Sequence, residues 1–303
     1  RMCGPGLMLA GAGRVLSPQN RSSLMDISQP TTPSAADALS LRYGAEAAPA
    51  AGPWNEHIGL LLSHRSIRGY RPDALPTGTL EMLIAAAQSA ATSSNLQTWS
   101  VIAVTDPDKK AALAKVAANQ KHIEQCPLFL VWVADISRNQ RLGAEEAITL
   151  ETMPYQETFL VAAIDAALAA QNATVAAESL GLSCVYIGAL RNNPPEVARI
   201  VGLPSGAFGV FGMCVGYAST ATANEVKPRL PQDVVVHREV YDTTGERAHR
   251  AAYDSLISAF SSRNEMAADT WTKRVINRMG KLAAMAGRDK MVAALHAMGF
   301  ELR

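Results

Sequence analysis

This chain of 303 residues lacks long uninterrupted hydrophobic runs, paired cysteines and paired histidines. No segment approaches the roughly 20 consecutive apolar residues of a membrane-spanning helix, so we expect no membrane partner. The six histidines form no His-x-x-x-His pair, and the four cysteines lack the close spacing of zinc sites, which predicts no metal site. Three of the cysteines lie in apolar, strand-like runs, typical of buried thiols in a reducing, cytoplasmic compartment: Cys126, Cys184 and Cys214.

A strong charge of either sign is also missing. The net charge is +1, whereas general nucleic-acid binding normally requires a strongly basic face. The chain has no Gly-x-Gly-x-x-Gly, Walker, Gly-x-Ser-x-Gly or His-Glu-x-x-His motif. Any positive potential is therefore local, which suits a small anionic ligand better than a polymer.

The first fifty or so residues are rich in Ala, Ser, Pro and Gly and show no sustained periodicity. We interpret residues 1–53 as a flexible leader, or in part as upstream sequence that is not native, with Met25 as a possible true start. Residues 54–303 form the expected ordered domain, because 48% hydrophobic content supplies a substantial core.

Hydrophobic periodicity predicts alternating helices and strands, and therefore an α+β domain with one covered sheet. The most prominent pattern is an almost wholly apolar helix over residues 155–180, about 39 Å long, which a second subunit would partly cover. Other helices are expected over residues 54–64, 78–91, 106–118, 194–201, 247–260, 269–286 and 289–298. Strands are expected over residues 99–105, 127–134, 183–190 and 208–217.

Two cationic segments stand out, far apart in the sequence. His64-Arg65-Ser66-Ile67-Arg68 places two guanidinium groups and a hydroxyl within four residues, and Lys227-Pro228-Arg229 lies in a downstream loop. Arginine matches phosphate oxygens two at a time, so the two segments predict an organic phosphate held from both sides. The alternative is that both are solvated surface charges.

Five segments together carry a resemblance: residues 64–68, 93–97, 120–122, 186–189 and 227–229. The phrases HRSIR, QKH, ESLGL, VYIG, LRNN and KPRLP occur in register. In this respect the chain resembles the flavin-dependent nitroreductase superfamily, specifically its oxygen-insensitive NADPH nitroreductase branch. The resemblance runs from about His57 to the C-terminus.

The resemblance implies a nitroreductase-like α+β fold, with a mostly antiparallel sheet covered by helices and a long central helix at a dimer interface. It also implies a homodimer that binds FMN between subunits and is reduced by NADPH or NADH. The FMN contacts that it implies are His64, Arg65, Ser66, Arg68, Ser93 or Ser94, Gln120, Tyr186, Ile187, Gly188, Ala189, Lys227 and Arg229. Asn95 is added as a contact because its side-chain amide could bond the flavin ring.

Side-chain chemistry supports these assignments to different extents. Arg65, Lys227 and Arg229 suit a phosphate, and Arg68 beside the pyrimidine edge would favour the anionic reduced flavin. Gly188 would let a flat ring approach the backbone closely, although a simple turn at the end of a strand is the alternative.

Other positions keep two interpretations. Asn95 could bind the imide edge of the ring or cap the preceding helix, and Tyr186 could be a ring contact or part of the core. Lys121 and His122 remain weak candidates for the cofactor or the substrate channel. Asp165, inside the long apolar helix, is expected to bond neighbouring backbone or an arginine and not to act in catalysis, because an unpaired buried carboxylate is costly.

The expected activity is hydride transfer from NAD(P)H to a small-molecule acceptor, a nitroaromatic, quinone or similar compound, by a ping-pong mechanism. No catalytic side chain is assigned, since the flavin carries the chemistry. The alternatives are a flavin or quinone reductase with a non-nitro acceptor and a flavin-binding module without turnover.

The nicotinamide preference is a separate question. The branch carries an arginine-rich loop before the phrase DTW. This chain keeps Arg263 in the corresponding loop but has Ala267 and Ala268 where basic residues would be expected. Because a 2′-phosphate requires a nearby cation, we expect weaker discrimination for NADPH, with Arg263 or Arg191 as substitutes.

Overall fold

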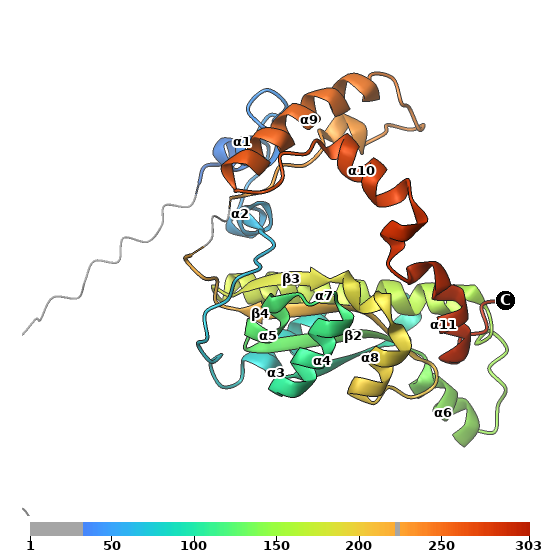
Figure 1. The fold of residues 1–303 in the computed structure, drawn as a ribbon. Helices are drawn as coiled ribbons and strands as arrows, with labels where there is room; N and C mark the ends of the chain where they lie inside the picture. Colours follow the sequence, from blue (N-terminus) through green and yellow to red (C-terminus); the bar gives the residue numbers. More distant parts are fainter. Residues whose placement is uncertain (1–32, 222–224) are drawn as a thin grey trace, which may run out of the picture. The chain divides into compact units, whose positions relative to one another are not determined.

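The computed structural model describes residues 33–221 and 225–303. In these residues the strands β1 (Trp99–Val104), β2 (Leu128–Asp135), β3 (Ser183–Ile187) and β4 (Ala207–Gly216) form a sheet of order β1-β2-β4-β3 (Figure 1). Each neighbouring pair is antiparallel. Every residue of β2 is buried, as its continuous apolar run predicts for a strand covered on both faces. The predicted α+β fold with an antiparallel sheet is confirmed.

One face of the sheet is covered by α7 (Gln156–Ser179) and α3 (Thr79–Gln88). The alanines of α7 allow this 24-residue helix, about 36 Å long, to pack closely on the sheet. Its outer side is different, since Leu160, Ile164 and Leu168 are 49%, 48% and 43% exposed. These three residues, which we call the α7 stripe, follow one another at helical spacing.

The opposite face is covered by α4 (Pro107–Val116), α5 (Lys121–Gln125) and α8 (Pro194–Val201) (Figure 1). Each of the two longer helices begins with proline after a polar cap, a combination that satisfies the first free N–H groups. Asp106 accepts a bond from the N–H of Lys109, and Asn193 accepts one from the N–H of Glu196. The resulting core is apolar.

Three helices lie next to one another beyond the end of the sheet: α1 (Ala35–Tyr43), α2 (Glu56–Ser63) and α9 (Glu246–Arg263) (Figure 1). Helix α1 differs from expectation, because it falls within the segment predicted to be a flexible leader. Ser34 caps it by accepting a bond from the N–H of Asp37. Its packing depends on contacts with residues far along the chain. Residues 44–53 of the predicted leader follow α1 without a further helix or strand, and residues 1–32, with Met25, lie outside the described residues.

The C-terminal segment contains α10 (Trp271–Met279) and α11 (Met291–Ala297), with short 3-10 turns at Gln232–Val234, Leu282–Met285 and Arg288–Lys290. The predicted helix over residues 269–286 is wrong beyond Met279. It ends at Gly280, where a Cβ atom would lie 2.6 Å from the carbonyl oxygen of Ile276. Helix α6 (Ser137–Glu145) was not predicted, because its sequence is mostly polar and shows little apolar periodicity.

Helix α7 is the one helix of the described residues that is long and apolar enough, with a mean hydropathy of 1.5, to cross a membrane. Its inner face packs against β2 and α3, and it carries the buried carboxylate of Asp165. These contacts account for its apolar composition as that of a central core helix.

Candidate functional site

A cavity of about 280 Å³ lies where the segment after α2 meets the segment of residues 225–229. The two cationic segments singled out in the sequence therefore lie on one cavity, which we call the cationic cavity. Its lining consists of His64, Arg65, Ser66, Arg68, Glu225, Lys227, Arg229, Phe260, Asn264 and Met266.

The positive charge of this cavity is only partly offset. Among the described residues Arg68, Lys227 and Arg229 form no ion pair with a carboxylate. Arg229 donates to the carbonyl oxygen of Lys227 over 3.1 Å. Partial burial, followed by the nearby charges of Arg274, Arg68 and Arg229, lowers the pKa of Lys227. An anion in the cavity would relieve this repulsion.

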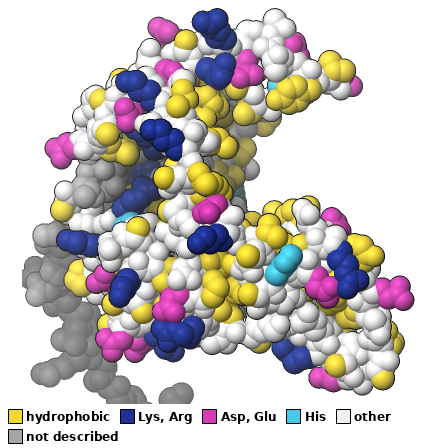
Figure 2. All heavy atoms as spheres, turned by 45° about the vertical axis from the view of Figure 1, so that its right-hand side comes forward, with side chains coloured by type: hydrophobic (Ala, Val, Ile, Leu, Met, Phe, Trp, Pro, Cys, Tyr) yellow, Lys and Arg dark blue, Asp and Glu magenta, His cyan; other side chains and the backbone are white. Residues whose placement is uncertain are grey.

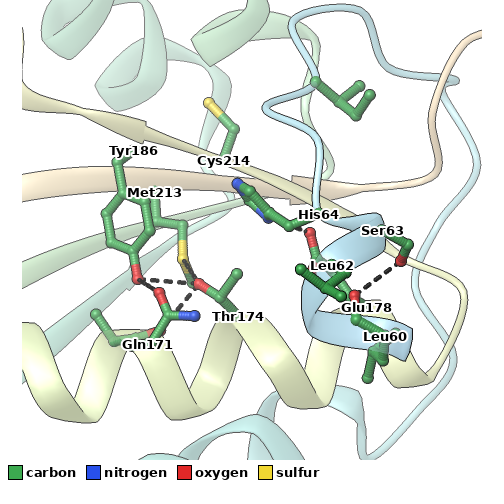
Figure 3. Close-up of polar contacts among 12 residues, drawn as sticks. Leu60, Leu62, Ser63, His64, Gln171, Thr174, Glu178, Tyr186, Met213 and Cys214 are labelled. Carbon is green, nitrogen blue, oxygen red and sulfur yellow. Dashed lines mark hydrogen bonds and ion pairs between the residues drawn. The ribbon is translucent and has the colours of Figure 1, made fainter. Parts of the chain in front are cut away.

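His64 is held by the central helix. Its Nδ1 lies 2.6 Å from Oε1 of Glu178, near the end of α7 (Figure 3). The pair is mostly buried, with 26% and 13% of the two side chains exposed. With Nδ1 engaged, Nε2 is the ring nitrogen left for a ligand. The role of Glu178 was not predicted, because its partner lies 114 residues away in the sequence.

The Ser93 loop is built around Asp165, which is 2% exposed. This loop contains the 3-10 turn η1 (Ser93–Asn95). Asp165 accepts bonds from the hydroxyls of Thr92 (2.6 Å) and Thr98 (3.0 Å) and from the N–H of Ser93 (3.1 Å). The prediction that Asp165 bonds neighbouring backbone is confirmed, and threonines take the place of the arginine considered as the other partner.

The backbone of the Ser93 loop is strained. Ser94, Asn95 and Gln97 have φ values of 48°, 55° and 51°, in the left-handed region. Such residues cost of order 1 kcal/mol each and persist where the surroundings enforce them. Asn95 does not cap the preceding helix, whose C-cap is Ser89. Its Oδ1 instead accepts a bond from Nε2 of Gln97.

Within one chain the Ser93 loop and His64 lie at different levels of α7. Their anchors, Asp165 and Glu178, are thirteen positions apart on one helix, which corresponds to about 20 Å along its axis. The predicted contacts Ser93, Ser94 and Asn95 are therefore not brought to the cationic cavity of the same chain.

Tyr186 is partly buried and packs against the core. Its hydroxyl lies 3.0 Å from Oγ1 of Thr174 (Figure 3). Its ring meets that of Phe211 edge-on at 5.1 Å between centroids. Burial raises the pKa of Tyr186 to about 12. The packing against Phe211 agrees with the core interpretation, and the contact with the flavin ring stays a prediction. The following Ile187 is also buried, at the end of β3.

Gly188 opens the 3-10 turn η2 (Gly188–Asn192), which also holds Ala189. A Cβ atom on Gly188 would lie 3.1 Å from Nη2 of Arg191, so the side chain of Arg191 uses the clearance there. Arg191 donates to the carbonyl oxygen of Val210, and burial, followed by the charge of Arg278, lowers its pKa.

Gln120 is the N-cap residue of α5, without a side-chain capping bond. The neighbouring His122 is buried, and burial, followed by the charge of Arg68, lowers its pKa. Of the predicted segment of residues 120–122, His122 thus feels the charge of Arg68, and none of the three residues lines the cationic cavity.

Arg263 is paired with Glu225, with Nη2 and Oε2 3.1 Å apart. Glu225, which the sequence analysis did not single out, lines the cationic cavity. Arg263, the cation considered for the 2′-phosphate of NADPH, is thus already paired with the carboxylate of Glu225. In the described part of the chain no group of three or more His, Cys, Asp and Glu side chains could hold a metal ion.

Comparisons with known proteins agree with this architecture. The model of the Nitroreductase family matches residues 61–217, and that of the Nitroreductase family, C-terminal domain, matches residues 227–303. The chain therefore belongs to the nitroreductase family.

Similar curated proteins include "FMN reductase (NADPH)" of Bacillus subtilis, 37% identical over 74% of this chain and 92% of that protein. "Oxygen-insensitive NADPH nitroreductase" of Salmonella typhimurium is 34% identical over 81% of this chain and 98% of that protein. Among solved structures, the NADPH:FMN oxidoreductase from Vibrio harveyi complexed with NAD+ has a TM-score of 0.72 at 34% identity. That comparison covers 82% of this chain and 100% of the Vibrio chain.

Proposed function

We propose that this chain is an FMN-dependent oxidoreductase that oxidises NADPH or NADH and reduces small electrophiles such as nitroaromatics or quinones. The observation that carries the proposal is the meeting of two cationic segments on one cavity, in a chain of the nitroreductase family. Relatives named as FMN reductases and NADPH nitroreductases support the same class of enzyme.

The residues of the cationic cavity fit the phosphate end of FMN. Arg65, Lys227 and Arg229 would face a phosphate of charge near −2, and the hydroxyl of Ser66 would add a short donor. Burial and, after it, the neighbouring cations lower the pKa of Lys227, and a bound phosphate would oppose both effects by favouring the charged form.

When bound, FMN supplies the hydride chemistry for which no side chain is required. The chain would contribute binding and orientation. His64, fixed by Glu178, would present Nε2, and Arg68 would place a positive charge near the pyrimidine edge. A single open cavity would be used in turn by the nicotinamide and by the acceptor, which favours a ping-pong order.

A homodimer is part of the proposal. The α7 stripe is an exposed apolar surface on the central helix, and hydrophobic side chains also lie exposed on the face in Figure 2. The Ser93 loop lies about 20 Å along α7 from the position of His64. A second copy packed on the α7 stripe would bring its own Ser93 loop toward the cationic cavity and complete the site.

Two other functions use the same cavity: a flavin or quinone reductase whose acceptor is not a nitro compound, and a flavin-binding module without turnover.

The three free cysteines of the described residues are buried, which supports a cytoplasmic protein.

The test is to purify the protein, identify any released flavin by mass, and assay NADH and NADPH against nitroaromatic, quinone and free-flavin acceptors. Nucleotide consumption that depends on the acceptor supports the enzyme, and the best acceptor separates the first two functions. A flavin that stays oxidised with both nucleotides would leave the binding module. A protein without affinity for FMN would refute the proposal.

A further inference from the structure

Arg42, the penultimate residue of α1, lies outside both family matches, which cover residues 61–217 and 227–303. It is 5% exposed, although arginine is seldom buried without a carboxylate partner. Its guanidinium donates to three main-chain carbonyl oxygens, those of Leu62 (2.6 Å), His64 (3.0 Å) and Lys227 (2.8 Å).

Two of these carbonyls, those of His64 and Lys227, belong to the two cationic segments that line the cavity, and that of Leu62 lies near the end of α2, just before the first segment. The backbone adds a fourth link, since the N–H of Arg229 donates to the carbonyl oxygen of Arg42 over 2.8 Å. Arg42 therefore bonds to both cationic segments at once. A planar guanidinium can hold donors in fixed directions toward several acceptors, whereas a lysine ammonium lacks this fork.

Helix α1 is itself held in place. Gly44 ends it with φ of 78°, and a Cβ atom there would lie 3.1 Å from Cδ2 of Leu256 on α9. Tyr253, also on α9, donates from its hydroxyl to the carbonyl oxygen of Pro228. The helices α1 and α9 therefore support the segment of residues 227–229 from two sides.

Arg42 also adds a charge to a region already rich in cations. Burial, followed by the nearby charge of Arg229, lowers the pKa of Arg42. A buried cation of this kind is costly for the protein alone and becomes favourable when an anion is bound nearby.

We propose that Arg42 is a positioning residue that sets the spacing of the two cationic segments and thereby the affinity for the phosphate of FMN. This inference rests on the proposed function, because it assumes that the cationic cavity takes that phosphate. Since α1 lies outside the matched family regions, this support is a feature of the chain beyond what the family match covers.

The test compares the binding of FMN with that of riboflavin, which has the same ring and no phosphate. Dissociation constants are measured by flavin fluorescence for the full-length wild type, Arg42→Met, Arg42→Lys and the control Arg199→Met. Arg199 is an exposed residue of α8 paired with Glu196. Circular dichroism and melting temperature report whether each variant is folded.

We expect Arg42→Met to weaken FMN binding by about tenfold or more, the scale of one charged hydrogen bond or two. Riboflavin binding should be unchanged, so that the ratio of the two affinities falls. Arg42→Lys should also lose most of the preference for FMN over riboflavin, because a lysine ammonium keeps the charge but cannot donate to all three carbonyls. The control should match the wild type.

Four results would overturn the inference. Equal FMN affinity in wild type and Arg42→Met would do so while leaving the proposed function intact, provided the wild type binds FMN. An equal loss for FMN and riboflavin would indicate a general structural role. If Arg42→Met fails to fold, Arg42→Lys serves as the test. A ratio of FMN to riboflavin affinity equal to that of the wild type in Arg42→Lys would contradict the inference. A wild type that binds neither flavin would refute the proposed function and the inference together.

Discussion

Oε1 of Glu178 lies 2.6 Å from Nδ1 of His64, so the central helix holds a side chain of the cationic cavity in one orientation. The exposed fraction of the Glu178 side chain is 13%, which limits solvent screening of the pair. Glu178, on the helix that packs against the sheet, thus fixes the orientation of His64, which is expected to contact the cofactor.

Glu178→Gln should weaken FMN binding about fivefold, the equivalent of about 1 kcal/mol for a charge-assisted hydrogen bond that is partly buried. The physical reason is that His64 would lose its fixed orientation. Flavin titration measures the effect, with Glu157→Gln at the exposed start of the same helix as the control. Identical dissociation constants for wild type and Glu178→Gln would show that the pair does not position His64 for the ligand.

Arg65→Ala and Arg229→Ala should each yield protein that purifies without FMN, because each removes a cation expected to hold the phosphate. A loss of about 2 kcal/mol, the scale of one charged hydrogen bond, reduces affinity roughly thirtyfold. The flavin-to-protein absorbance ratio of the purified variants measures retention. Arg199→Ala is the matched arginine away from the cavity. Normal flavin content in both variants would contradict the assignment of the phosphate to this cavity.

Asp165→Ala should lower the free energy of unfolding by about 2–4 kcal/mol, because the buried donor of Thr98 and the partly buried donors of Thr92 and Ser93 would lose their acceptor. Urea denaturation at a fixed protein concentration measures the change. Thr92→Ala, which removes one hydroxyl, should cost about 1 kcal/mol. If Asp165→Ala is as stable as the wild type, the Ser93 loop is not held in the way described.

Tyr186 should make the protein less stable in strong alkali. Its pKa is raised to about 12 in the folded protein from an ordinary value of 10.0. The unfolded chain therefore releases this proton at lower pH than the folded chain, and stability falls as the pH rises from 10 to 12. The contribution is fully present below pH 10.

Urea midpoints of wild type and Tyr186→Phe, measured from pH 8 to 12, test this expectation. Ionisations common to both proteins, including that of the buried Tyr70, cancel in the difference. The wild type should lose stability more steeply than Tyr186→Phe over the upper part of the range. Parallel curves would contradict a raised pKa at Tyr186.

Glu225→Gln should increase the preference for NADPH over NADH. The change removes the carboxylate that faces Arg263 over 3.1 Å and leaves the guanidinium available to a 2′-phosphate. We expect the wild type to discriminate weakly and the variant to discriminate several-fold more, measured as the ratio of kcat/KM for the two nucleotides. Overwhelming NADPH preference in the wild type would refute the hypothesis, as would an unchanged ratio in the variant.

Much of the fold could be predicted because the deciding forces are local. The continuous apolar run of β2 indicates a strand covered on both faces, and Asp106 before Pro107 marks the start of α4. Pattern alone fails at the end of α10, because apolar residues continue beyond Gly280 although the helix stops at Met279. It also fails for α1, whose stability depends on α2 and α9 and not on its own periodicity.

Some residues of the candidate site could be predicted from the sequence and others could not. Arginine-rich segments are visible in the sequence, so the cationic cavity could be anticipated. Arg42, Glu178 and Glu225 could not, because each acts through a partner between 20 and 185 residues away. Each stands in an unremarkable local sequence, and only the folded chain brings the partners together.

The placement of Arg42 has a practical side for anyone who engineers this enzyme. The first family match begins at residue 61, and a version trimmed to that boundary would discard α1. The carbonyls of Leu62, His64 and Lys227 would then face water. Fusion tags and immobilisation handles are better joined ahead of residue 33, so that biosensors or biocatalysts derived from the protein keep their prosthetic group through dilution and washing.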